Sequence, residues 1–190
     1  MIEKDFMQTI LGSTQSVFSF CDIAMLLEDS DADNLKRRIS YYVQKGVLIR
    51  LRKGLYAKPI YNKEEIAGKI FVPSYISGEY VLRKNGIIFQ YGDEITVVSY
   101  LSRTVSVADF DIVIRKIKDS VLVDTSGIEK SAQGVSIASS ERALLDVLYL
   151  NKDFFFDNIS SINKASVYRL AKIYRSKVLI KRVKKVFGDD

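Results

Sequence analysis

A change of hydrophobic period at Gly46 constrains the fold of this chain more than any other feature. Before Gly46, apolar residues recur at helical spacing, namely Leu35, Ile39, Tyr42 and Val43. After it, residues 47–51 form a strand-like run, residues 52–54 a tight turn, and residues 55–57 a second strand. The pattern predicts a helix that ends at Gly46 and is followed directly by a β-hairpin.

Two shorter helices are predicted before this one. The first covers residues 3–11 and has Phe6 and Ile10 on its apolar face. The second covers residues 23–27, with Ser19 as N-cap and Asp22 in a capping-box position. The third helix runs from a cap at Ser30 or Asp31 to about residue 44. Three helices and a hairpin, in this order, predict a winged helix-turn-helix domain over residues 1–62.

The charge of the chain is divided into blocks. Residues 34–62 contain eight basic residues and no acidic residue, whereas residues 1–33 contain one basic and seven acidic residues. Residues 160–190 contain nine basic and two acidic residues. Two concentrated basic blocks favour a polyanionic partner, although a solvated basic face is the common alternative.

The predicted third helix and hairpin place polar and basic groups where a DNA-binding domain needs them. We expect Arg37 and Arg38 to reach the major groove. Basic residues on the hairpin would contact phosphates beside the groove. The full set of candidate DNA-binding residues is Asn34, Lys36, Arg37, Arg38, Ser40, Tyr41, Arg50, Arg52 and Lys53. A hairpin that only packs, or that binds a protein, is the alternative.

The remainder of the chain, residues 63–190, is predicted to be an α+β domain. Helices are expected over residues 63–70 and from Pro73 to Asn85. Alternating runs over 95–100, 105–107, 112–117, 121–124 and 135–138 predict a small antiparallel sheet. A helix capped by Ser139 follows.

Two C-terminal helices are predicted near residues 163–175 and 177–187. Their basic residues form a possible second basic surface, consisting of Lys172, Arg175, Lys181, Arg182, Lys184 and Lys185. This surface could contact DNA or an acidic partner protein, or it could be a solvated face.

The composition argues against an enzyme. The chain has no histidine and a single cysteine, which excludes His-based acid–base catalysis and the usual zinc sites. Glu141, Arg142 and Asp146 are interpreted as a favourable helix start and an i,i+4 ion pair rather than as catalytic groups. We therefore expect no metal and no cofactor. The N-terminus lacks a signal-peptide pattern and no stretch suits a bilayer, so we expect a cytoplasmic protein with no membrane partner.

Three segments resemble the AbiE-type antitoxins of type IV toxin–antitoxin systems. Residues 42–56 are similar to the family's helix-to-wing signature, a KG-hydrophobic-x-R-h-x-x-G-x-Y run. Residues 73–82 and 86–88 are similar to a PSYISLxSAL segment followed by GLI, although Gly78 stands where Leu is common and residues 79–81 replace small residues. Residues 139–146 resemble S-x-E-R-T-L-L-D.

The resemblance implies a winged-helix antitoxin of a bacterial abortive-infection system that acts in phage defence. Such a protein would bind double-stranded DNA repeats in its own promoter as an autorepressor. It would counteract a nucleotidyltransferase-like toxin encoded beside it. Two other functions stay open: a stand-alone winged-helix transcriptional regulator with a sensory C-terminal domain, and a protein-interaction adaptor without DNA binding.

Overall fold

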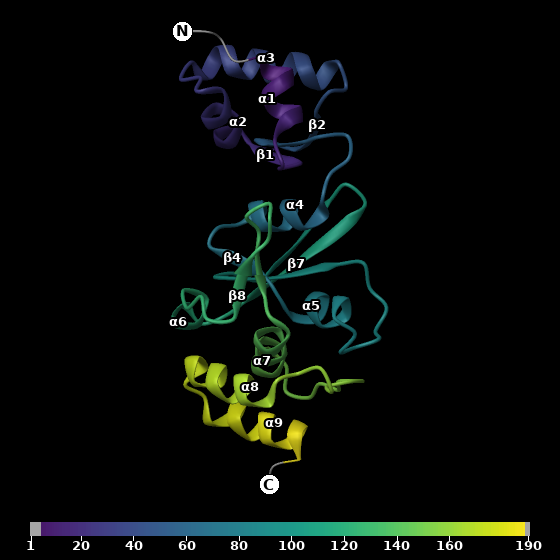
Figure 1. The fold of residues 1–190 in the computed structure, drawn as a ribbon, viewed down its shortest axis with the longest axis vertical. Coiled ribbons are helices and arrows are strands. Elements are labelled where there is room, and N and C mark those ends of the chain that lie inside the picture. The colour runs from purple at the N-terminus through teal and green to yellow at the C-terminus, as the bar shows by residue number, and fades with distance from the viewer. Residues whose placement is uncertain (1–4, 189–190) are drawn as a thin grey trace. The chain divides into compact units, whose positions relative to one another are not determined.

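The computed structural model describes residues 5–188, and the chain divides into two compact units, Met1–Lys69 and Ile70–Asp190 (Figure 1). Residues 3 and 4 of the first predicted helix lie outside the described residues.

The first unit consists of helices and a three-stranded antiparallel sheet with strand order β1-β3-β2. Its elements are α1 (Phe6–Gly12), β1 (Val17–Ser19), α2 (Phe20–Leu27), α3 (Ala32–Gln44), β2 (Ile49–Arg52), β3 (Leu55–Ala57) and α4 (Lys63–Ile70), whose last residue falls in the second unit. The predicted three helices and hairpin are present. Strand β1, which the sequence pattern did not predict, pairs with β3 and completes the sheet.

Local capping explains where α2 and α3 begin. The Ser19 side chain accepts a hydrogen bond from the Asp22 N–H, and the Asp22 carboxylate accepts one from the Ser19 N–H, which completes the predicted capping box. Asp31 caps α3 by accepting from the N–H groups of Asp33 and Asn34. Beyond the end of α3, Gly46 adopts φ +72°, which favours glycine.

The core of the first unit is formed by the apolar faces of α1, α2 and α3 and by the start of the hairpin. Its buried residues are Phe6, Ile10, Phe18, Ile23, Leu27, Leu35, Ile39 and Leu48. Tyr42 lies at the edge of this core and stacks on Phe6 with ring centroids 4.1 Å apart. Because Leu35 and Ile39 are buried, the opposite face of α3 must point to solvent.

The second unit has the α+β class that was predicted. Its sheet has strand order β6-β7-β5-β4-β9-β8. Its elements are β4 (Ser74–Ile76), α5 (Gly78–Lys84), β5 (Ile95–Ser99), β6 (Arg103–Val107), β7 (Phe110–Lys116), α6 (Asp119–Leu122), β8 (Ile128–Lys130), β9 (Ser136–Ala138), α7 (Ser140–Leu150), α8 (Lys164–Ala171), a 3-10 turn η1 (Lys172–Tyr174) and α9 (Lys177–Phe187). The sheet is mixed, because β5 pairs in parallel with β7 and β4 with β9. The C-terminal helices α8 and α9 pack against α7 (Figure 1).

The helix predicted to begin at Pro73 begins later. Residues 74–76 form β4, and α5 starts only at Gly78. Tyr75 and Ile76 fit a strand because aromatic and β-branched side chains pack well on a sheet, and β4 lies between β5 and β9. Gly78 has φ +63°, and a Cβ there would lie 2.9 Å from Thr96 Cγ2. This accounts for the glycine at a position where the similar PSYISLxSAL segment commonly has leucine.

The prediction of a strand over residues 121–124 is wrong. Val121 and Leu122 lie in α6, and both are buried. The N–H groups of Val121 and Leu122 donate to the Lys118 carbonyl at 2.9 and 3.0 Å, which are the local hydrogen bonds of a helical turn and not bonds to a neighbouring strand. Strand β8 lies further along the chain than predicted, at Ile128–Lys130.

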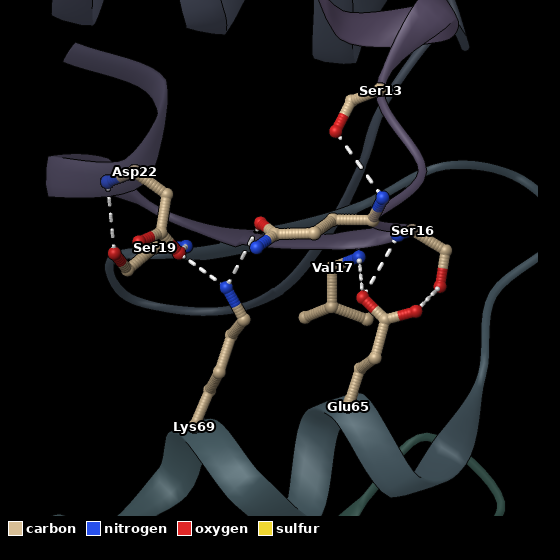
Figure 2. A network of polar contacts seen from close by, with 8 residues as sticks. Ser13, Ser16, Val17, Ser19, Asp22, Glu65 and Lys69 are labelled. Carbon is tan, nitrogen blue, oxygen red and sulfur yellow. Dashed lines mark hydrogen bonds and ion pairs between the residues drawn. The ribbon is translucent and has the colours of Figure 1, made fainter. Parts of the chain in front are cut away.

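The boundary between the units falls after Lys69, not near residue 62 as predicted. Figure 2 shows the reason: Glu65 and Lys69 reach from α4 to β1 and α2 of the first unit. The Glu65 carboxylate accepts hydrogen bonds from the N–H groups of Ser16 and Val17 at 2.8 and 3.0 Å, and from Ser16 Oγ at 2.7 Å. Lys69 forms an ion pair with Asp22.

The ion pair with Lys69 also affects the acidity of Asp22. Burial alone would raise the pKa of its carboxyl, but hydrogen bonds from Lys69 and Ser19 outweigh burial and hold that pKa below its ordinary value. Asp22 is therefore ionised at neutral pH, where it serves both the α2 cap and α4.

Candidate nucleic-acid interface

The outward face of α3 carries most of the predicted contact residues. Asn34, Lys36, Arg37, Ser40 and Tyr41 are all exposed. They are fixed in direction because Leu35 and Ile39, on the other face, are almost completely buried. The structure thus places these five side chains on one accessible helical surface.

The acidic residues at the start of α3 are satisfied within the unit. Asp31 is used as the N-cap, and Asp33 pairs with Lys36 at 2.9 Å. The Lys36–Asp33 pair is exposed, so solvent screens it and it can exchange readily for another anion. Arg37 has no acidic partner among residues 5–188, so its charge is uncompensated there.

Arg38 differs from the other candidates. It is half-buried, pairs with Asp29 at 3.1 Å and lies over the Phe6 ring, with Cζ 5.7 Å from the centroid. Arg38 lies beside the buried face of α3, so its guanidinium points toward α1 instead of away from the unit. The expectation that Arg38 accompanies Arg37 at the groove is therefore corrected: Arg38 holds α1 and the α2–α3 loop against α3.

Tyr41 has one aromatic neighbour and one basic neighbour among the described residues. It is 52% exposed and meets the Tyr42 ring edge-on at 5.2 Å. Lys45 Nζ lies 5.6 Å from the Tyr41 ring centroid. Lys45 was not among the predicted site residues, although its i,i+4 spacing from Tyr41 was the signal that could have included it.

The β2–β3 hairpin presents the other candidates. Arg50, Arg52 and Lys53 are exposed, and no ion pair joins any of them to an acidic residue in the described part of the chain. A register shift between Arg50 and Arg52 marks an irregularity in the strand. Gly54 completes the turn at φ +77°, and its carbonyl accepts a hydrogen bond from the Phe20 N–H at 3.1 Å. The turn is thus anchored to the start of α2 while its basic side chains stay free.

The hairpin follows α3 without a flexible linker. The N–H groups of Val47 and Leu48 both donate to the Tyr42 carbonyl, at 3.0 and 3.3 Å. Leu48 then enters the same core as Leu35 and Ile39. The helix face and the hairpin therefore belong to one rigid frame within the first unit.

Five of the six residues predicted for the second basic surface are exposed, and Arg182 is not. Lys172, Arg175, Lys181, Lys184 and Lys185 are exposed on η1, α9 and the connection between them. Arg182 is half-buried and donates from Nη1 to the carbonyls of Leu148 and Asn151, at 2.6 and 3.0 Å. It therefore caps the end of α7, and its prediction as a surface residue like the lysines is corrected.

The Arg142–Asp146 pair is more deeply placed than an ordinary i,i+4 pair. Both side chains are 0% exposed, with Nε and Oδ1 3.7 Å apart. Asp146 accepts hydrogen bonds from Ser77 Oγ at 2.7 Å and from the hydroxyls of Tyr75 and Tyr174. Arg142 donates hydrogen bonds to the carbonyls of Val121 and Ser126 and to the Tyr75 hydroxyl. Burial raises the pKa of Asp146 by more than Arg142 and the hydroxyl donors lower it. No solvent reaches the pair, so it joins α7 to β4, α6 and η1 rather than facing a substrate.

Within residues 5–188, no group of three or more histidine, cysteine, aspartate or glutamate residues could hold a metal ion. Among the helices that the structure describes, none is both long and apolar enough to cross a membrane.

The sequence matches no protein-family model and none of the curated proteins. Among solved structures, the crystal structure of the Rv2827c protein from Mycobacterium tuberculosis is similar, with a TM-score of 0.58 at 12% sequence identity. The similarity covers 96% of this chain and 75% of that chain. At this identity, the comparison shows a shared fold and carries no statement about function.

Proposed function

We propose that the first unit is a winged helix-turn-helix that binds double-stranded DNA. In this proposal α3 enters the major groove and the β2–β3 hairpin lies against the phosphate backbone beside it. The observation that carries the proposal is the set of exposed, unpaired basic side chains on these two connected elements: Arg37, Arg50, Arg52 and Lys53 among the described residues.

The roles of the contact residues follow from their chemistry. Arg37 lies in the first half of α3, where a guanidinium can donate two hydrogen bonds to a guanine edge. Asn34 precedes it by one turn and can pair with adenine. Arg50, Arg52 and Lys53 would bind phosphates, which adds affinity but no sequence information.

We further propose that the protein is an antitoxin and autorepressor rather than an enzyme. Support comes from the three sequence segments that resemble AbiE-type antitoxins. In this role it would bind repeats in its own promoter and counteract a nucleotidyltransferase-like toxin. A stand-alone regulator with a sensory second unit is the alternative.

The contribution of Arg37 gives a test of groove recognition. We expect Arg37→Ala to weaken binding to the DNA upstream of the protein's own gene by about 1–3 kcal/mol, because a bidentate base contact is lost. Binding to a scrambled duplex of equal length should change much less. Fluorescence anisotropy at fixed salt measures both affinities, and Lys116→Gln, which removes an exposed charge from the second unit, is the matched control.

Equal losses on both duplexes would refute base recognition by Arg37. Undetectable binding of the unaltered protein at low salt would refute DNA binding and leave a protein-interaction adaptor.

The antitoxin role is tested by co-expression: the adjacent gene product should arrest growth alone and fail to arrest it when this protein is present. Absence of such a toxic neighbour would favour the stand-alone regulator.

A further inference from the structure

A pocket of about 510 Å³ lies within the second unit, beside the end of α7 and against α9. Its walls are largely apolar and come from α7, from the segment that follows it and from α9; they include Leu148, Phe154, Phe156, Ile159 and Val186. Phe154 and Phe156 form a tilted pair with centroids 5.0 Å apart. A volume of this size suits a small organic molecule.

The polar groups at this pocket are mostly cationic. Lys152, Arg182 and Lys185 line it, and Asp153 is the one acidic residue among its described lining residues. Both lysines are exposed, so their ammonium groups can turn toward a bound anion. An apolar interior with a cationic rim is complementary to an amphipathic anion.

Arg182 gives this pocket an ordered cationic group. Its Nη1 is held by the two carbonyls at the end of α7, which fixes the guanidinium plane. Its Nε and Nη2 have no hydrogen-bond partner within residues 5–188, and neither atom is sealed from solvent. The guanidinium that lines the pocket is therefore fixed in orientation and keeps the Nε and Nη2 donors available. A carboxylate binds to such an edge with two hydrogen bonds.

We propose that this pocket binds a small aromatic carboxylate. The carboxylate would accept hydrogen bonds from Arg182 and pair with Lys185, with Lys152 adding to the positive charge of the rim. The ring would pack against Phe154 and Phe156, which offer aromatic faces and edges. The site would act as a ligand-sensing element of the second unit, independent of whether the first unit binds DNA.

The test uses the full chain, with 2-naphthoate as probe and 2-naphthamide as its neutral counterpart. Titration followed by amide chemical shifts should show saturable shifts at residues 148–159 and 182–186. Removing the probe's charge should weaken binding about tenfold, as expected for the loss of about 1.4 kcal/mol from a charge-assisted contact. Lys185→Gln should weaken naphthoate binding about fivefold or more, because it removes one of the rim charges.

Lys181→Gln is the matched control, because it removes the same charge one turn earlier on α9 and does not line the pocket. It should leave naphthoate affinity within about twofold, since an exposed charge away from the site is screened. Val186→Trp, which fills the pocket, should abolish binding while the circular dichroism spectrum stays unchanged. Three results would overturn the proposal: no saturable binding, equal affinity for the amide, or equal losses for Lys181→Gln and Lys185→Gln.

Discussion

At the scale of single residues, the buried Arg142–Asp146 pair shows what sequence spacing can and cannot reveal. The i,i+4 spacing predicted the pair, and the structure contains it. It did not predict full burial, because the partners Tyr75, Ser77 and Tyr174 come from segments far away in the chain. The same limit explains Arg38, whose pairing with Asp29 depends on how α1 packs on α3.

Replacing one member of the buried pair should be costly. We expect Asp146→Leu to lower the free energy of unfolding by about 3–5 kcal/mol, because Arg142 would be left as an uncompensated buried charge. Arg142→Met should have a similar effect. The double variant should be less destabilised than the sum of the two, as chemical denaturation in a double-mutant cycle would measure. Additive losses would contradict the coupling that the geometry implies.

At the scale of elements, segments marked by a clear period, cap or turn residue were predictable, and segments fixed by contacts far away in the chain were not. The third helix and the hairpin followed from periodicity, caps and glycine positions. Strand β1 has only three residues, and its pairing with β3 is not encoded by any local pattern. Its position also depends on Glu65, which is 48 residues away from Val17. Helix α6 was predicted as a strand over residues 121–124 for a related reason, because contacts with the rest of the unit decide its conformation.

The role of Glu65 can be measured directly. Glu65→Ala should destabilise the first unit by about 2–4 kcal/mol, because it removes a charged acceptor from two backbone N–H groups, one of them buried. Hydrogen exchange at the amides of Ser16 and Val17 should accelerate accordingly. Asp33→Ala, which breaks only the exposed pair with Lys36, should cost no more than about 1 kcal/mol. Unchanged exchange at these two amides in Glu65→Ala would show that α4 does not hold β1.

At the scale of the whole molecule, charge blocks and fold class were predictable, but the boundary between the units was not. Composition placed a boundary near residue 62, where proline and asparagine end the hairpin. The structure continues the first unit to Lys69 because α4 supplies acceptors and an ion pair to it. The candidate DNA surface was predictable in outline, since all its candidate residues, from Asn34 to Lys53, lie within the acid-free stretch of residues 34–62.

The boundary leads to a prediction about fragments. A fragment of residues 1–69 should unfold cooperatively on heating, whereas residues 1–62 should not, because the shorter fragment leaves the Ser16 and Val17 N–H groups without their acceptor. Circular dichroism and the dispersion of amide resonances would distinguish the two. Equal thermal stability of both fragments would place the boundary at residue 62 after all.

The central proposal, DNA binding through α3 and the β2–β3 hairpin, is tested most directly by salt dependence. The affinity of the full chain for duplex DNA should fall linearly with the logarithm of salt concentration. The double variant R52Q/K53Q should reduce the slope by about two units, because each lost phosphate contact removes about 0.9 unit. Lys116→Gln should leave the slope unchanged. An identical slope for R52Q/K53Q and the unaltered protein would contradict the proposed interface.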